Sequence, residues 1–170
     1  PVFGGINLED IASPKCFEIE KRIISRLDIP VMHDDQHGTA IVVLAALINA
    51  AKVVKKRLPA LRVVISGAGA AGTAVTKLLL KAGVKDIIVL DSKGIIAKSR
   101  EGLLPHKKEL ANKTNPRGVR GGLRDALKNA DVVIGVSGPG LMNAPHIKLM
   151  AKNPIVFAMA NPTPEIMPEE

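Results

Sequence analysis

The chain has 170 residues, of which 46% are hydrophobic and 24% are charged, so it is long enough for one buried core and too apolar to be disordered. Its formal net charge is +8, yet it contains three Phe and no Tyr or Trp, and single-strand nucleic-acid binders need aromatic side chains for stacking. The basic residues are also spread along the sequence. We interpret them as solvated helix faces that attract anionic small molecules, with no nucleic-acid partner.

Cysteine content and hydropathy favour a cytoplasmic protein. Cys16 is the single cysteine, which excludes an internal disulfide and fits a reducing compartment. No secretory signal is recognisable at the start of the sequence. The longest apolar stretch, residues 40–54, is interrupted by Asn49 and Lys52, and we expect a buried helix there with no membrane span. Because the sequence opens on Pro1 without Met and stops after a predicted strand, we expect flanking sequence on both sides.

The first 57 residues are predicted to form a helical connector that carries site residues. Ser13 and Pro14 are typical of an N-cap and a first helical position, and apolar residues at spacings of three or four continue that helix to about Leu27. Residues 31–32 predict a short extended run. A second, apolar helix is expected at about 40–56.

From residue 58 onward, predicted strands and helices alternate. Strands are predicted at 61–66, 86–90, 131–136 and 155–159, and helices at 70–81, near 106–112, at 123–128 and at 145–151. β-branched runs separated by helical segments are typical of a parallel sheet. The predicted fold class is therefore α/β: a Rossmann-like, doubly wound parallel sheet in residues 58–170, preceded by the connector in residues 1–57.

A glycine-rich turn follows the first of these strands and predicts a dinucleotide site. Gly67 permits a tight turn, Gly69 lets the backbone approach a pyrophosphate, and Gly72 lets helix and strand pack closely. The helix that follows offers its N-terminal N–H groups to the phosphates. The pattern is weak alone, but a strand before it and an alanine-rich helix after it strengthen it. The six residues of the pattern are Gly67, Ala68, Gly69, Ala70, Ala71 and Gly72.

Asp91 closes the second predicted strand, about 20 residues beyond the glycines, where an acid that binds the ribose hydroxyls is expected. Ser92, Lys93, Lys98 and Arg100 follow it and could hold a 2′-phosphate or form a solvated basic loop. The choice between NAD and NADP stays open on this pattern. A weak preference for NAD follows, because a carboxylate repels a 2′-phosphate.

Two acidic clusters, Glu9–Asp10 and Asp34–Asp35, each follow a short apolar run. Carboxylates from two segments can hold Mg²⁺ or Mn²⁺, which prefer oxygen ligands, although the spacing alone favours capping and turn residues. For His33 and His37 a structural role is expected, because no thiol or carboxylate stands at zinc spacing. Cys16 is expected in a helix core.

Two turns, at residues 136–140 and 160–164, end the last two predicted strands. In an open parallel sheet the ligand crevice lies outside the carboxyl ends of the strands, so Ser137 is expected near the dinucleotide. Asn161, followed by Pro162, is placed to hydrogen-bond a carboxylate or a carboxamide. A plain Asn-Pro turn is the alternative.

Four segments in order closely resemble the malic enzyme family, in its shorter bacterial and archaeal type, and the resemblance runs over essentially the whole chain. The segments are residues 4–11 (GGINLEDI), 33–40 (HDDQHGTA), 66–72 (SGAGAAG) and 160–163 (ANPT). The resemblance implies metal- and NAD(P)-dependent oxidative decarboxylation of (S)-malate to pyruvate and CO₂.

The resemblance also implies roles for individual residues. It implies Mg²⁺ or Mn²⁺ held by Glu9, Asp10 and Asp35, and it implies that Asp34 supports the catalytic base. Asn161 matches a residue at the substrate and nicotinamide end. The expected partners are malate and pyruvate and a second copy of the chain, as a homodimer or a higher homo-oligomer.

The sequence departs from the family in its acid–base residues. The family's general acid is a Tyr, which this chain lacks, and its catalytic Lys precedes the segment that begins at Pro1. The chain is therefore expected to be a fragment that is inactive alone. Two alternatives stay open: another amino- or hydroxy-acid dehydrogenase, against which the acidic clusters argue, and a basic module that binds RNA or senses redox state. Salt-dependent nucleic-acid binding would favour the module.

Overall fold

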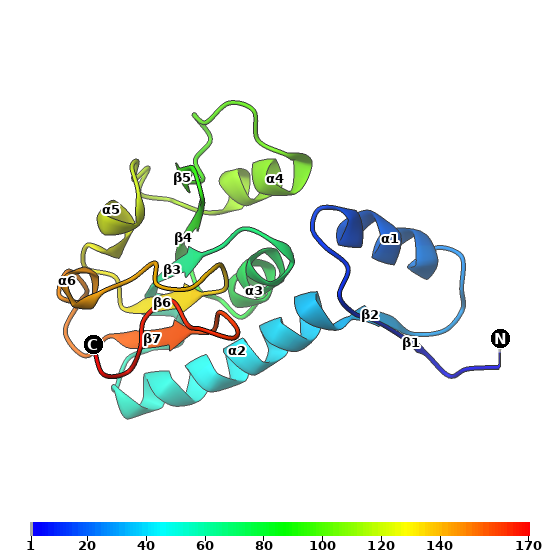
Figure 1. The fold of residues 1–170 in the computed structure, drawn as a ribbon, viewed down its shortest axis with the longest axis horizontal. Coiled ribbons are helices and arrows are strands. Elements are labelled where there is room, and N and C mark those ends of the chain that lie inside the picture. Colours follow the sequence, from blue (N-terminus) through cyan, green and yellow to red (C-terminus); the bar gives the residue numbers. More distant parts are fainter. Residues whose placement is uncertain (1) are drawn as a thin grey trace.

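The computed structural model describes residues 2–170, which form a small N-terminal part and a larger sheet domain joined by one long helix (Figure 1). In the N-terminal part, strands β1 (Ile6–Leu8) and β2 (Val31–His33) pair in parallel. Helix α1 (Lys15–Ile24) connects them, and helix α2 (Asp34–Val53) starts directly after β2. The connector therefore contains a two-stranded parallel sheet as well as helices.

Several predictions for this part were wrong in detail. The N-cap of α1 is Pro14, and no side chain caps the helix, so Ser13 is not its N-cap. Helix α2 begins at Asp34 and not near residue 40. The carboxylates of Asp34 and Asp35 in its first turn stabilise this earlier start, because they interact favourably with the positive end of the helix dipole. Strand β1 was not predicted, since three residues are too few to display an alternating pattern.

The larger part is built on a five-stranded sheet in which β3 and β6 lie side by side. The chain goes outward from β3 to β4 and then returns to the other side of β3, which is the topology of a doubly wound sheet. This confirms the predicted fold class. A two-residue edge strand that runs antiparallel was not predicted. The strand order is β5 (Gly94–Ile95), β4 (Asp86–Asp91), β3 (Arg62–Ser66), β6 (Val132–Gly135) and β7 (Ile155–Ala158).

Helices cover both faces of the sheet. Successive residues of β3 alternate between two cores, because side chains on a strand point to opposite faces: Val63 packs with α2, α3 and α4, and Val64 packs with α5 and α6. Helix α6 ends earlier than predicted, and a short 3₁₀ helix, η1 (Leu58–Ala60), precedes β3. The helix bounds are α3 (Ala70–Lys81), α4 (Pro105–Lys113), α5 (Leu123–Leu127) and α6 (Ala144–Ile147).

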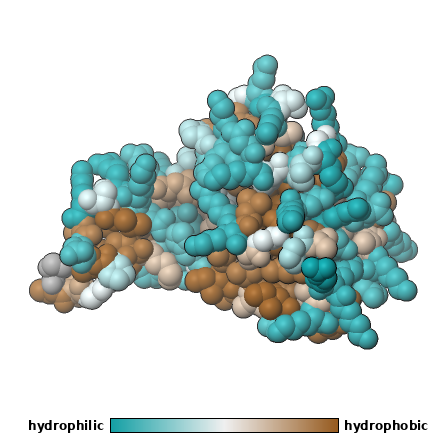
Figure 2. Space-filling model, turned by 180° about the vertical axis from the view of Figure 1, so that it is seen from behind, coloured by the Kyte–Doolittle hydropathy of each residue, from teal (hydrophilic) through white to brown (hydrophobic). Residues whose placement is uncertain are grey.

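Only one face of α2 is buried, so the prediction of a buried helix was half right. Val43 and Leu47 are fully buried in the core shared with α3, whereas Ile41, Val42 and Val53 are more than half exposed. Figure 2, seen from behind, shows apolar surface along the lower part of the molecule, at the level where α2 runs in Figure 1. By length and composition alone, α2 is the one helix within residues 2–170 that could cross a membrane.

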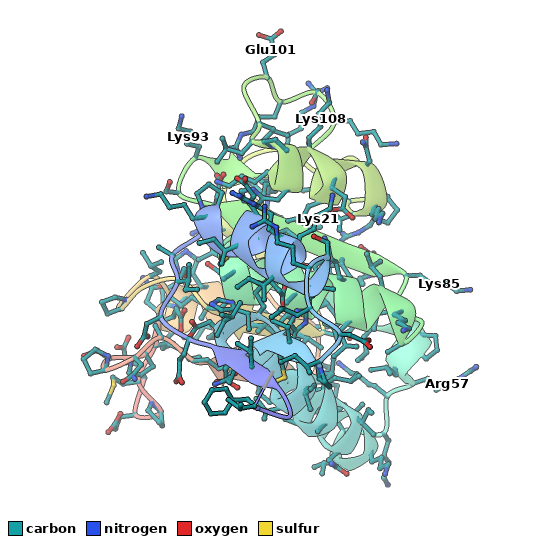
Figure 3. All side chains as sticks on the ribbon, turned by 90° about the vertical axis from the view of Figure 1, so that its right-hand side faces the viewer. Lys21, Arg57, Lys85, Lys93, Glu101 and Lys108 are labelled. Carbon is teal, nitrogen blue, oxygen red and sulfur yellow. The ribbon has the colours of Figure 1, made fainter. Side chains whose placement is uncertain are left out.

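The basic side chains are distributed over the surface. Arg57, Lys85 and Lys108 project outward in Figure 3, the first two from loops and Lys108 from α4. The basic charges are thus scattered over loops as well as helix faces, so the interpretation of the net charge as solvated helix faces holds only for part of them.

Candidate functional site: a crevice at the strand ends and a neighbouring acidic cluster

A crevice of about 810 Å³ lies at the carboxyl ends of β3, β4 and β6. The strand order reverses between β3 and β6, and in open α/β sheets this switch point is where ligands bind. Residues Ser13, Pro14 and Leu104 add a wall from outside the sheet. The predicted cofactor residues that line the crevice are Gly67, Ala68, Gly69, Asp91, Ser92 and Ser137.

The three glycines of the turn meet different neighbours. Gly67 has a φ of +119°, and a Cβ there would lie 2.6 Å from the carbonyl oxygen of Val136, which directly follows β6. A Cβ on Gly72 would collide with the carbonyl oxygen of Gly67, so this glycine allows α3 to pack against the turn. No heavy atom lies within 4 Å of a Cβ on Gly69. The protein itself therefore does not need glycine at position 69, and its open side faces the crevice.

Helix α3 begins at the floor of this crevice. Its N-cap is Gly69, which has no side chain with which to cap the first N–H groups. Ala70, Ala71 and Gly72 form the first turn and do not line the crevice. An uncapped N-terminus beside an open crevice suits an anion such as a pyrophosphate.

Asp91 lies in the crevice wall with its carboxylate already paired. Its Oδ2 accepts hydrogen bonds from Arg100 and Lys107, each at 2.7 Å, and its Oδ1 accepts from the backbone N–H of Lys93 at 2.9 Å. Burial by itself would raise the pKa of Asp91, but the Arg100 and Lys107 hydrogen bonds outweigh it and hold the pKa well below its ordinary value. One carboxylate thus faces two cations, which weakens the electrostatic argument against a 2′-phosphate.

Helix α4 contributes His106 and Lys107 to the crevice, and sequence reasoning missed both. The ring of His106 lies 4.9 Å from that of Phe17 on α1, measured between centroids. Burial lowers the pKa of His106, and the nearby Lys107 adds to this, so the ring is neutral near pH 7. No sequence motif identifies these two residues as crevice residues, because α4 reaches the crevice only through the long loop that follows β5.

Of three further residues predicted to bind the cofactor, Ser137 lines the crevice, whereas Lys93 and Asn161 do not. Ser137 follows β6 in the crevice, and its hydroxyl lies 3.3 Å from that of Ser66 at the end of β3. Lys93 is exposed and points outward in Figure 3. Asn161 is exposed beyond β7 and does not line the crevice. Cofactor contacts of Lys93 and Asn161 therefore stay predictions.

The two acidic segments emerge from the same end of the small sheet, because Leu8 of β1 pairs in register with His33 of β2. The backbone N–H of Asp10 donates to Oδ2 of Asp35 at 2.9 Å. Glu9 is exposed, and Asp34 lies beside Asp35 in the first turn of α2.

The donor chemistry and the adjacency of these segments fit a hard divalent cation. Within residues 2–170, no three His, Cys, Asp or Glu side chains gather closely enough to hold a metal ion. The set Glu9, Asp10 and Asp35 stays a prediction.

A buried network behind the acidic cluster involves both histidines. Glu20 of α1 accepts hydrogen bonds from the backbone N–H of His33 at 3.1 Å and from the side chain of Gln36 at 3.2 Å. It also pairs with Nε2 of His37 at 2.8 Å. The structural role expected for His37 is thereby supported. The ring of His33 lies 3.2 Å from Gln36 through Nδ1 and 3.3 Å from Oδ2 of Asp35 through Nε2, so its expected role stays a prediction. Glu20 was missed because a single acid on a helix carries no motif. Cys16 is fully buried on the same helix, which confirms its core position, and burial raises the pKa of its thiol.

Comparison with known proteins identifies relatives over the whole chain. A family model described as "Malic enzyme, NAD binding domain" matches residues 36–169. The chain is 57% identical to an NAD-dependent malic enzyme of Geobacillus stearothermophilus and 50% identical to an NADP-dependent malic enzyme of Halomonas elongata. These matches cover 99% and 98% of the chain, but only 35% and 39% of the relatives.

A solved structure gives the same result. The crystal structure of an NAD-dependent malic enzyme from Thermotoga maritima superposes with a TM-score of 0.95 at 47% identity, over 98% of this chain and 45% of that one. The crevice at the switch point, its glycine turn and these matches agree, and the chain belongs to the malic enzyme family.

Proposed function

We propose that this chain supplies the dinucleotide site and the metal-binding carboxylates of an enzyme that oxidatively decarboxylates (S)-malate. The products are pyruvate, CO₂ and reduced NAD(P). The observation that carries the proposal is the glycine turn Gly67–Gly72 at the switch point of the sheet, with its open side on the crevice. Both NAD- and NADP-dependent enzymes are among the relatives, and the paired state of Asp91 suits either cofactor.

Within this proposal the glycine turn and the N-terminus of α3 hold the pyrophosphate, and the Asp91 region holds the adenosine ribose. Ser137 then faces the nicotinamide end. The turn after β7 carries Asn161 on the same side of the sheet, where its amide can hydrogen-bond the substrate carboxylate or the cofactor carboxamide.

Glu9, Asp10 and Asp35 would hold Mg²⁺ or Mn²⁺. When bound, the cation would supply Lewis-acid stabilisation of charge on malate's oxygens. The carboxylate of Asp35 already accepts the backbone N–H of Asp10, which brings the two acidic segments together. Asp34, one residue earlier in the first turn of α2, would support the polar network around the catalytic base.

We further propose a cytoplasmic, homo-oligomeric enzyme. The free, buried Cys16 suits a reducing compartment. The exposed apolar face of α2, with Ile41, Val42 and Val53, suits coverage by further polypeptide. Malate and pyruvate are the proposed small-molecule partners.

Two measurements test the proposal. Titration calorimetry of the 170-residue chain with NAD and with NADP is expected to give one saturable site for at least one of them. An enzyme that carries this sequence is expected to reduce NAD(P) with malate in the presence of Mg²⁺ or Mn²⁺ and to stop on chelation. Absence of dinucleotide binding, or chelator-resistant malate oxidation, would contradict the proposal.

A further inference from the structure

A fully buried carboxylate lies behind the nicotinamide end of the crevice. The side chain of Glu165 is 0% exposed. Its Oε1 accepts a hydrogen bond from the backbone N–H of Ser137 at 3.0 Å, and its Oε2 accepts one from the backbone N–H of Ala160 at 3.1 Å. A buried carboxylate loses its hydration and needs such donors. One side chain therefore connects the turn after β6 with the turn after β7.

The surrounding backbone is shaped around this carboxylate. The N–H groups of Gly140 and Met142 donate to the carbonyl oxygens of Pro164 and Glu165, at 3.1 Å and 2.9 Å. A Cβ on Gly135, the last residue of β6, would run into the Glu165 carboxyl group. Glycine at position 135 thus leaves room for the acid at this place.

The contacts continue across the ends of three strands. The hydroxyl of Ser137 lies 3.4 Å from Oε1 of Glu165 and 3.3 Å from the hydroxyl of Ser66. Ser66 ends β3 and directly precedes the glycine turn. On the far side, Ala160 directly precedes Asn161. The polar chain therefore spans from the phosphate-binding turn to the turn that carries Asn161.

We propose that Glu165 is a positioning residue that ties the Ser137 turn to the Asn161 turn, and so fixes the place of the Ser137 turn at the nicotinamide end of the crevice. This inference rests on the proposed function, because the nicotinamide is assigned to that end by the dinucleotide site. Glu165 does not line the crevice. It acts through the two backbone N–H groups that it holds.

The variant Glu165→Gln isolates this role. The amide has nearly the same shape but only one acceptor oxygen, and its NH₂ group would face a backbone N–H donor. Either Ser137 or Ala160 then loses its partner, and the two turns are no longer held together. Asp131→Asn is the matched control. Asp131 directly precedes the same strand β6 at its opposite end, where its carboxylate accepts the backbone N–H of Arg62 at 2.9 Å.

The test compares two ligands in the 170-residue chain by titration calorimetry. NADH occupies the whole crevice, whereas ADP-ribose lacks the nicotinamide ring. Glu165→Gln is expected to weaken NADH binding about tenfold, as one lost hydrogen bond to a charged acceptor implies, and to change ADP-ribose binding less than twofold. Asp131→Asn is expected to leave the ratio of the two affinities unchanged.

Equal weakening of both ligands, or no change for either, would overturn the positioning role while leaving the dinucleotide site in place. If the unmodified chain binds neither ligand, the proposed function fails instead. Amide hydrogen exchange gives a readout without ligand: in Glu165→Gln the Ser137 or Ala160 amide is expected to exchange faster, with the strand amides of β3 unchanged. Unaltered exchange at both amides would likewise contradict the proposal.

Discussion

The crevice is formed mainly by backbone groups, whereas the acidic cluster is formed by side chains. The crevice is formed by backbone: glycines that admit a close approach between β3 and β6, and the uncapped start of α3. The acidic cluster is formed by carboxylates at the ends of two three-residue strands. The backbone N–H of Asp10 donates one hydrogen bond to the side-chain carboxylate of Asp35, and Glu9 is exposed.

The acidic cluster should therefore depend on its ligand more than the crevice does. Backbone in a packed sheet keeps its geometry whatever is bound, because the core holds it. Several carboxylates brought together repel one another, so a cation is expected to draw them into place and to offset that repulsion.

The largest effect is expected from Asp35→Ala in an enzyme that carries this sequence. Loss of a proposed metal ligand should reduce malate turnover by about a hundredfold or more. The affinity for NAD(P), measured by calorimetry, should change little, because the crevice uses other segments. Full metal-dependent activity in this variant would remove Asp35 from the ligand set.

Gly69→Val should abolish dinucleotide binding, with an affinity loss of about a hundredfold. The new side chain would point to the open side of the turn, where a pyrophosphate is expected. Because no protein atom lies within 4 Å of that Cβ, the thermal midpoint should be nearly unchanged. Calorimetry measures the affinity, and thermal denaturation of the same sample measures the midpoint. An unchanged affinity would refute the proposed pyrophosphate site.

Gly72→Ala should act on folding instead. The added methyl group would meet the carbonyl oxygen of Gly67, and overpacking of this kind costs about 1–3 kcal/mol. Urea denaturation measures the change in the free energy of unfolding, with Gly69→Ala as the control at an open position. Equal stability of the two variants would show that close helix–turn packing is not required.

Lys107→Ala should lower NADP affinity relative to NAD by a few-fold. The variant removes one of the two cations beside Asp91, so the remaining carboxylate repels a 2′-phosphate more strongly. Lys113→Ala removes an exposed cation paired with Glu109 and serves as the control. A competition assay in which both variants keep the same NADP-to-NAD ratio would contradict this assignment.

The smallest effect is a difference in acid stability. The pKa of Asp91 is lowered in the folded chain, so the unfolded chain binds more protons as the pH falls below about 4. The stability that Asp91 contributes is therefore present at neutral pH and is lost as the pH falls through and below that range. Asp91→Asn should flatten the decline in unfolding free energy between about pH 5 and pH 2, and an identical decline would contradict the pairing.

The sheet domain could be predicted from sequence because its signals are local. The runs before Gly67 and Asp91 are β-branched, and the strands are found within one residue of the predicted ends. The glycine turn follows its strand directly. Buried parallel strands and tight turns leave such patterns because packing and backbone geometry act on neighbouring residues.

The rest depended on contacts that sequence spacing does not reveal. Lys107 reaches Asp91 at the end of β4 from helix α4, 16 residues away, and Glu165 reaches Ser137 over 28 residues. Strands β1 and β5 are two or three residues long and are stabilised by their partners. The N-cap at Ser13 failed because Pro14 occupies that position.

Helix α2 joins the acidic cluster to the sheet domain without a flexible segment. Its first turn carries Asp34 and Asp35, and further along Val43 and Leu47 pack in the core that α3 shares. One inserted residue inside α2 would rotate the acids by about 100° and shift them by about 1.5 Å relative to the phosphate-binding turn. Changes in chain length between the two sites are therefore tolerable only after Val53, in the segment that leads to β3. The spacing from Asp35 to the core residues of α2 therefore fixes the distance between the acidic cluster and the glycine turn.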